Sequence, residues 1–362
     1  MKDLIKHLIK FFNRTANYLF WKVSSRKNKL PKIKTILIIN DGFIGDLISI
    51  TPLLDVLKKN KIKVGLAIRQ EMEPLFKIDP RISNLISFQD LFRSNLKKYD
   101  ALLLISPNNP KFIQSLKDKN NLILAQPFHN HFSTLSKQLE GLTPPFIFEN
   151  HRVIQNLNYL KLIPEINFNL KNISPANHPL TLYFNRQEIK LTLNKYKIQD
   201  DFIIISPGSR GQKKLGVKFP EPIVFANVIK YLVKLKFKVV LIGSKQDESF
   251  CKDSCLATNN KKRVLNLAGK TSINELIGLI SASSGIVAID SGSVHIASCL
   301  NKKTIDLIRK SATPIWYPWT TQKFILIKSK NENLNKVSSK EIITAINEIN
   351  FKTKEHENIR IN

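Results

Sequence analysis

Short apolar runs alternate, from Lys34 onward, with segments whose apolar residues recur at helical spacing. The short runs predict buried strands, and the helical spacing predicts the crossover helices of a parallel sheet. In the first half of the chain we expect strands over residues 35–40, 63–69, 84–88, 101–105 and 122–125, and helices over 47–59 and 152–162.

A segment rich in Asn and Pro, residues 164–183, has no sustained period and predicts the end of one domain. A second series follows, with strands expected over 201–206, 238–242, 264–267, 285–289 and 303–308, and helices over 221–235, 272–282 and 294–300. Two such series predict an α/β protein with two Rossmann-like domains, residues 34–180 and 181–345, whose parallel sheets face each other across a cleft. An N-terminal segment, 1–33, and a C-terminal tail, 346–362, are expected outside them.

The chain is strongly basic, with 57 Lys and Arg against 28 Asp and Glu and a formal net charge of +29. A hydrophobic fraction of 43% excludes a disordered chain. The charge favours an anionic partner, namely nucleic acid, an acidic membrane surface or phosphorylated ligands. The alternative is a compositional bias that scatters lysines over solvated faces, since 46 of the 57 cations are Lys. No nucleic-acid-binding motif occurs, so we expect no nucleic-acid partner.

Residues 1–34 carry ten basic side chains and one acid, among apolar residues at helical spacing. This pattern is typical of an amphipathic helix on an anionic membrane surface, although a helix docked on its own domain or a frayed basic tail would also fit. The sequence contains neither an apolar run of about 18 residues nor a signal-peptide core. Its three cysteines favour neither a disulfide framework nor a zinc site, which fits a reducing compartment. We therefore predict a cytoplasmic protein held peripherally at the inner face of the cytoplasmic membrane.

The first candidate site is the turn Asp-Gly-Phe-Ile-Gly-Asp, residues 41–46, which follows the first predicted strand. Gly42 and Gly45 allow a tight turn and a close approach of a ligand to the backbone. Asp46 falls at the start of a helix, where a carboxylate either caps the helix or acts as a general base. A third glycine is missing, so the turn is not a dinucleotide-binding fingerprint.

The second candidate site is the turn Ser206-Pro207-Gly208-Ser209, at the end of the strand expected over 201–206. Its backbone N–H groups and the cations of the next loop suit a diphosphate. An ordinary Pro-Gly turn beside a solvated basic loop is the alternative. The cations of this loop are Arg210, Lys213, Lys214 and Lys218.

The third candidate site follows the strand expected over 285–289 and contains Asp290, Ser291, Gly292, Ser293 and His295. Small polar residues at a helix N-terminus form an anion site, and a histidine in the first turn is a candidate base. Alternatively, the aspartate or the second serine caps the helix, and the histidine is a packed polar residue.

A capping box precedes the third site, because Ser272 and Glu275 have the spacing at which each satisfies the backbone of the other. This pairing explains the start of a helix without any further role. Lys270 and Thr271, just upstream, remain available to contact a ligand.

These motifs, in this order, resemble those of glycosyltransferase family 9, the bacterial lipopolysaccharide heptosyltransferases. The matching segments are GFIGDLISITPLL, SPGS with its basic loop and a Phe219-Pro220 step, LIGSKQD, LAGKTSINEL and DSGSVHIA. The resemblance implies a GT-B fold and a nucleotide-sugar donor, typically ADP-heptose. It also implies a glycolipid acceptor, inversion at the anomeric carbon, and no metal or other cofactor.

The resemblance, carried over residue by residue, makes Asp46 the general base and places Gly42 and Gly45 in the acceptor-side loop. It assigns donor binding to residues of the second half: Ser206, Gly208, Ser209, Lys214, Lys218, Gly243, Lys270, Thr271, Asp290, Ser291, Gly292 and His295. An inverting transfer needs a carboxylate that takes the acceptor proton while the leaving diphosphate gains charge on the opposite side.

The chain departs from the family pattern at two points. Val217 stands where the family has the Lys of a Lys-x-Trp-Pro step and Phe219 replaces the Trp, so Lys214 or Lys218 is expected to take over. Arg309 follows a predicted strand after which the family continues with Gly. These departures leave an alternative function, that of a catalytically degenerate GT-B protein that binds a nucleotide sugar or a glycan.

Overall fold

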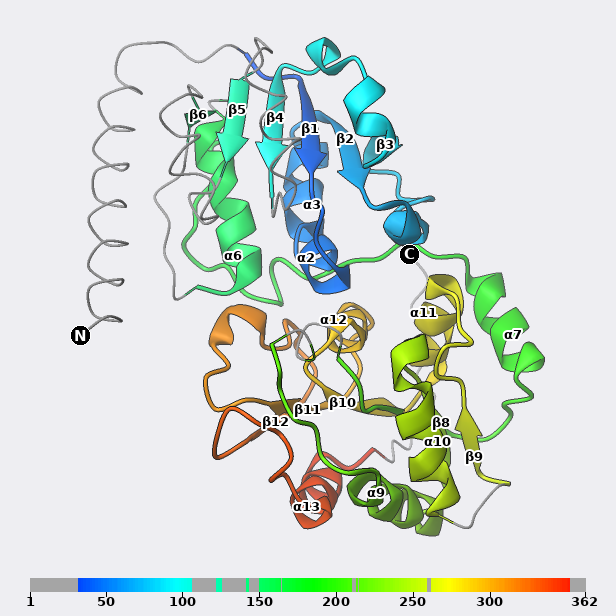
Figure 1. Cartoon of the computed structure of the whole chain (residues 1–362). Helices are drawn as coiled ribbons and strands as arrows, with labels where there is room; N and C mark the ends of the chain where they lie inside the picture. The colour runs from blue at the N-terminus through cyan, green and yellow to red at the C-terminus, as the bar shows by residue number, and fades with distance from the viewer. Residues whose placement is uncertain are drawn as a thin grey trace. The chain divides into compact units, whose positions relative to one another are not determined.

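The computed structural model (Figure 1) describes residues 32–105, 122–125, 141–142, 150–163, 165–209, 213, 215–258 and 262–351. The chain divides into two compact units, Met1–His178 and Pro179–Asn362, close to the boundary expected at residue 180. The predicted N-terminal amphipathic helix and its membrane contact lie outside the described residues, and so does Lys214. No helix within the described ranges combines the length and the apolar character that crossing a membrane requires.

The first unit contains a six-stranded parallel sheet in the order β3-β2-β1-β4-β5-β6. Its strands are β1 (Thr35–Ile39), β2 (Lys63–Ile68), β3 (Ile82–Ser87), β4 (Ala101–Leu104), β5 (Leu122–Ala125) and β6 (Gly141–Leu142). Each strand predicted in this half is present. The strand order changes direction between β1 and β4, and doubly wound sheets bind ligands outside the carboxyl ends of strands at such a point.

Both helices predicted in the first unit are divided in the structure, and three further 3-10 turns were not predicted. The helical segments are α2 (Ile44–Ile48), α3 (Thr51–Lys59), α6 (Arg152–Leu157) and the 3-10 turns η1 (Gln70–Leu75), η2 (Asp90–Arg93), η3 (Leu96–Lys98) and η4 (Asn158–Leu162). The single helix predicted over 47–59 is wrong, because α2 and α3 are separate. Pro52 has no N–H to offer the Ile48 carbonyl, which accepts a hydrogen bond of 2.9 Å from Thr51 Oγ1 instead.

The second unit contains a parallel sheet in the order β12-β11-β10-β7-β8-β9. The strands are β7 (Phe202–Ser206), β8 (Lys238–Leu241), β9 (Val264–Asn266), β10 (Gly285–Ile289), β11 (Thr304–Ile308) and β12 (Phe324–Lys328). Counted from the other edge, this is the strand order of the first unit, so β7 and β10 correspond to β1 and β4. The five predicted strands are confirmed, and β12 is a sixth.

The helices of the second unit are α7 (Arg186–Lys195), α9 (Pro222–Lys234), α10 (Glu248–Leu256), α11 (Ile273–Ala282), α12 (Gly292–Cys299) and α13 (Ser339–Ile349), with the 3-10 turns η5 (Lys245–Asp247) and η6 (Pro314–Trp316). The predicted capping box starts α11, since the Ser272 N–H donates to Glu275 Oε2 at 2.8 Å and the Glu275 N–H donates to Ser272 Oγ at 3.2 Å. α13 continues across residue 346, the expected start of the tail, because Ile346 and Ile349 are buried.

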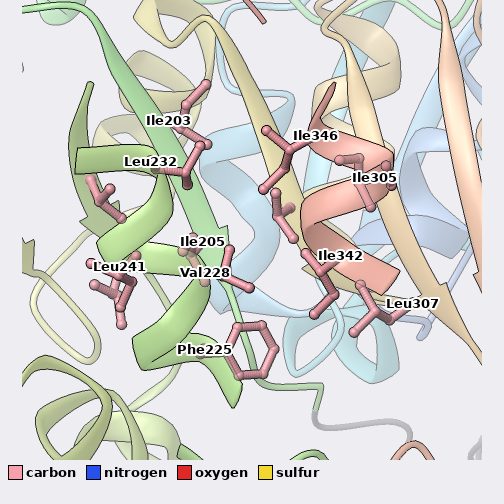
Figure 2. Packing of buried hydrophobic residues seen from close by; sticks show 14 of the residues in the cluster. Ile203, Ile205, Phe225, Val228, Leu232, Leu241, Ile305, Leu307, Ile342 and Ile346 are labelled. Atoms are coloured by element: carbon pink, nitrogen blue, oxygen red, sulfur yellow. The ribbon is translucent and has the colours of Figure 1, made fainter. Parts of the chain in front are cut away.

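One core of the second unit lies between the sheet and the helices α9 and α13 (Figure 2). Phe225 and Leu232 of α9 and Ile342 and Ile346 of α13 are buried there with strand residues such as Ile305. Burial of a large apolar side chain stabilises the fold by roughly 1.5–3 kcal/mol. This packing fixes the strands whose carboxyl ends carry the second and third candidate sites.

Candidate functional site

Asp46 lies in the first turn of α2, just beyond the carboxyl end of β1. Its Oδ2 accepts a hydrogen bond of 3.0 Å from the Phe43 N–H, at the residue that precedes the helix. The capping interpretation is therefore correct in a modified form, because Asp46 reaches back to the backbone from the third helical position. The carboxylate is half-buried and is held by its own loop.

The loop before α2 is shaped around Asp46. A Cβ on Gly42 would lie 2.4 Å from the Asp46 Cβ and 2.7 Å from its Oδ2, so only glycine fits there without moving the carboxylate. Arg69, just after β2, pairs with Asp41 at 2.6 Å between Nε and Oδ1, and its guanidinium lies 5.0 Å from the centre of the Phe43 ring. These contacts hold the first half of the turn in place.

The turns after β7 and β8 meet at one buried carboxylate, that of Asp247. Its Oδ2 accepts hydrogen bonds from the N–H (2.9 Å) and Oγ (2.7 Å) of Ser244, and its Oδ1 lies 2.6 Å from Lys213 Nζ. A Cβ on Gly208 would lie 2.1 Å from Oδ1, and a Cβ on Gly243 would lie 2.9 Å from the Asp247 Cβ. The structure therefore brings these two predicted glycines together around the carboxylate of Asp247, which the family resemblance places with Gly243 in the nucleotide-side loop.

Of the four loop cations, Arg210 lies outside the described residues with Lys214, and Lys213 is the described one that contacts the turn after β8. Besides its pair with Asp247, its Nζ donates to the Gln246 carbonyl at 3.2 Å and lies 5.9 Å from the centre of the Phe219 ring. Lys218 is exposed, and Lys214 lies outside the described residues. The geometry therefore favours Lys213 as the donor-side lysine, rather than Lys214 or Lys218, the two that the sequence analysis named.

Lys270 and Thr271 follow β9. The Gly269 N–H donates to the Gly243 carbonyl at 2.9 Å, which ties this turn to the turn after β8. The Lys270 ammonium donates to the Asn266 carbonyl at 3.3 Å and so folds back on its own turn. The turn lies beside the site, with its lysine engaged locally.

A chain of serine hydroxyls joins the turn after β7 to the start of α12. Ser293 Oγ donates to Ser206 Oγ at 3.0 Å, and Ser291 Oγ lies 2.8 Å from Ser293 Oγ. Ser291, which precedes the helix, makes no side-chain capping hydrogen bond. The N-cap position of α12 falls on Ser291, between Asp290 and Ser293, the two residues that the capping alternative named. The second and third candidate sites form one site, because the positive end of the α12 dipole adjoins the turn after β7.

His295 is buried in the first turns of α12, with 7% of its surface exposed. Its ring meets Trp316 edge to face, with 5.8 Å between the ring centres. Burial lowers the pKa of His295 to about 4, so the imidazole is neutral at pH 7. It can exchange hydrogen bonds with a ligand but adds no positive charge, which agrees with the packed-residue interpretation.

Arg309, the departure after β11, pairs with Glu332 at 3.6 Å between Nη1 and Oε2. Glu332 also accepts a hydrogen bond from Ser311 Oγ. The arginine is therefore held against the loop after β12, where a carboxylate offsets its charge.

Asp306 in β11 is a buried carboxyl group that the sequence analysis missed, although it interrupts an apolar run. It is 1% exposed, and neither carboxyl oxygen has a hydrogen-bond partner among the described residues. Burial, and to a lesser extent the nearby Asp290 charge, raises the pKa of Asp306 well above its usual value. The folded protein therefore holds a proton there at pH values at which the unfolded chain has lost it.

This difference predicts that Asp306→Asn stabilises the protein at pH 7. Above the unfolded pKa, stability falls with rising pH because the folded state binds the extra proton, and Asn cannot ionise. We therefore expect the free energy of unfolding of Asp306→Asn to exceed that of the wild type at pH 7, because only the wild type has to keep a proton on a buried carboxyl group. Urea unfolding should show the gain at pH 7 and its loss near pH 4. An equal gain at both pH values, or the same gain in the exposed control Asp253→Asn, would contradict this prediction.

The described residues contain no group of three or more His, Cys, Asp or Glu arranged to hold a metal ion. Among the described residues, Cys251, Cys255 and Cys299 form no disulfide. Burial raises the pKa of Cys251 to about 12, which makes this thiol unreactive at neutral pH.

Comparison with known proteins extends these observations. A family model described as glycosyltransferase family 9 (heptosyltransferase) matches residues 154–346, just over half of the 362 residues. The chain is 24% identical over 295 residues to lipopolysaccharide heptosyltransferase 3 of Escherichia coli. The matched region covers 76% of this chain and 83% of that protein. The fold resembles E. coli ADP-heptose lipopolysaccharide heptosyltransferase II, with a TM-score of 0.69, 20% identity, and coverage of 87% of this chain and 98% of that one. E. coli heptosyltransferase WaaC with ADP-2-deoxy-2-fluoro heptose gives a TM-score of 0.63 at 12% identity, over 87% and 99% of the two chains. These likenesses confirm the predicted α/β fold of the GT-B type.

Proposed function

The chain belongs to glycosyltransferase family 9, and we propose that it transfers heptose from ADP-heptose to a lipopolysaccharide core or a related glycolipid. The proposal is supported by the presence of both groups that the reaction needs. A fixed carboxylate, Asp46, stands at the carboxyl end of β1, and a site suited to a diphosphate stands at the carboxyl ends of β7, β8 and β10. A base and a stabilised leaving group are the two requirements of an inverting transfer.

Asp46 is the general base of the proposed reaction. It takes the proton of the acceptor hydroxyl as that oxygen forms a bond to the anomeric carbon. The bond from this carbon to the diphosphate breaks, and ADP leaves with the electron pair on the opposite side. The configuration at the anomeric carbon is therefore inverted, and the proton stays on Asp46.

The leaving diphosphate is proposed to lie at the start of α12, against the turn Ser206–Ser209. Helix N–H groups and the helix dipole stabilise its charge. Lys213, oriented by Asp247 and Phe219, takes the place of the lysine that the family pattern puts at residue 217. With these groups the reaction requires no metal ion.

The proposed acceptor is based on a relative of the chain, and the proposed location is based on the sequence. The relative from E. coli is named a lipopolysaccharide heptosyltransferase, and we assign the same class of acceptor to this chain. The basic, apolar pattern of residues 1–34 supports a contact with the anionic inner face of the cytoplasmic membrane, where a glycolipid acceptor is accessible.

A transfer assay on the full-length protein tests the proposal. ADP-heptose and a heptose-deficient lipopolysaccharide acceptor are supplied, and ADP release and the mass of the glycolipid are followed. We expect ADP release that depends on the acceptor, one heptose added to the glycolipid, and unchanged rates in EDTA. Binding of ADP-heptose without ADP release would instead favour the degenerate binding protein.

A further inference from the structure

The backbone carbonyl of Asp46 has lost its helical partner. α2 ends at Ile48, and the Ile50 N–H that a continuous helix would offer bonds to the Leu47 carbonyl at 3.4 Å. Two side chains donate to the Asp46 carbonyl instead: Ser49 Oγ at 2.7 Å and Asn40 Nδ2 at 3.3 Å. The backbone of the proposed base is thus held by side chains, at the break between two helices.

The Ser49 hydroxyl is in turn fixed by a distant residue. Asn156 Nδ2 donates to Ser49 Oγ at 2.9 Å. Asn156 lies on α6, 107 positions after Ser49 in the sequence. Hydrogen bonds therefore run in one direction, from Asn156 to Ser49 to Asp46. Asn156 is fully buried and Ser49 is 4% exposed, so water does not compete for these bonds. In such surroundings, hydrogen bonds in a chain strengthen one another.

Asn156 occupies a position at which packing alone favours an apolar residue. Leu157, Tyr159 and Leu160, which follow it, are fully buried. Asn156 Oδ1 has no hydrogen-bond partner within the described part of the chain, and leaving a buried amide oxygen unpaired lowers stability. A polar side chain kept at this cost calls for a role beyond packing.

We propose that Asn156 is a positioning residue, which acts through Ser49 on the Asp46 backbone and so sets where the Asp46 carboxylate meets the acceptor hydroxyl. The inference rests on the proposed role of Asp46 as general base. Asn40 completes the arrangement from the end of β1, since its Oδ1 accepts the Gly42 N–H at 3.0 Å while its Nδ2 reaches Asp46. The carboxylate itself is tied to the Phe43 N–H.

Breaking either link should slow the chemical step and leave substrate binding intact. We expect Ser49→Ala and Asn156→Ala each to lower kcat on the order of tenfold, with both KM values within about twofold, because a displaced base costs only transition-state stabilisation. The double variant should be no slower than the slower single variant, since both changes break one chain of bonds. Amide hydrogen exchange at Gly42 and Phe43 should be faster by about tenfold in both variants.

Tyr159→Phe is the matched control. It removes an equally buried hydrogen bond from the segment that follows α6, the 3.1 Å bond from the Tyr159 hydroxyl to the Leu104 carbonyl, without touching the Asp46 turn. We expect it to lower stability but to change neither kcat nor exchange at Gly42 and Phe43. Equal kcat losses in Tyr159→Phe and Asn156→Ala, or normal kcat in both Ser49→Ala and Asn156→Ala, would overturn the proposal.

Asp46→Asn belongs in the same series. If it is inactive while both link variants turn over normally, only the role of Asn156 fails. If it retains turnover, the proposed base is wrong, and the positioning role that depends on it falls as well.

Discussion

Asp46→Asn is expected to lower kcat between about 100-fold and 10,000-fold, the range for loss of a general base. Asn keeps the size of the side chain and an oxygen for the Phe43 N–H, so the turn before α2 should persist. The proposed donor site is built from residues of the second unit, so the Kd for ADP-heptose should stay within about twofold. Steady-state kinetics and titration calorimetry measure the two quantities on the same protein.

Asp55→Asn provides the control for this change. Asp55 lies on α3 and pairs with Arg81 at 2.8 Å, so the variant makes the same substitution in the same unit but away from the turn. Its kcat should stay within about twofold of the wild-type value, since it removes no group from the reaction. Normal turnover by Asp46→Asn, or an equal loss in Asp55→Asn, would show that Asp46 is not the base.

Gly208→Ala is expected to weaken ADP binding by about tenfold to a hundredfold, the scale of the loss caused by misplacing site groups by about 1 Å. The new methyl group would lie 2.1 Å from Asp247 Oδ1, so the carboxylate has to move. Its movement breaks the hydrogen bonds to Ser244 and the ion pair that orients Lys213. Calorimetry with ADP measures the loss directly.

The variant Asp247→Ala tests whether the loss of ADP binding in Gly208→Ala comes from the clash with the Asp247 carboxylate. In that background the methyl group at residue 208 meets no carboxylate, so Gly208→Ala should cost far less than in the wild type. An equal loss of ADP affinity in both backgrounds would contradict a role for Asp247 in shaping the turn.

The strands and turns of both units were predictable because their signals are local. The apolar run before Asp41 and the two glycines after it predict a strand, a tight turn and a helix start, and the structure has all three. Pro52 sits inside the predicted helix and marks the break between α2 and α3, a signal that the helical spacing concealed. α7 carries little periodic signal, because Thr192 is its one buried residue.

The contacts that build the site were not predictable, because they join residues far apart in the sequence. Four cations follow the turn after β7, and the choice of Lys213 depends on Asp247, which arrives with the turn after β8. The link from Asn156 to Ser49 spans 107 positions, and nothing in the sequence near Asp46 points to it. Asp306 was visible as an acid within an apolar strand, but its proximity to Asp290 follows from the pairing of β10 with β11.

Mass spectrometry of cell-surface glycolipid tests the central claim most directly, because the missing sugar and its position are both visible. Cells from which the gene has been deleted are compared with the same cells carrying either the wild-type gene or Asp46→Asn. We predict that the deletion removes one heptose and the sugars attached beyond it, that the wild-type gene restores them, and that Asp46→Asn does not. An unchanged glycolipid in the deleted cells, or full restoration by Asp46→Asn, would contradict this claim.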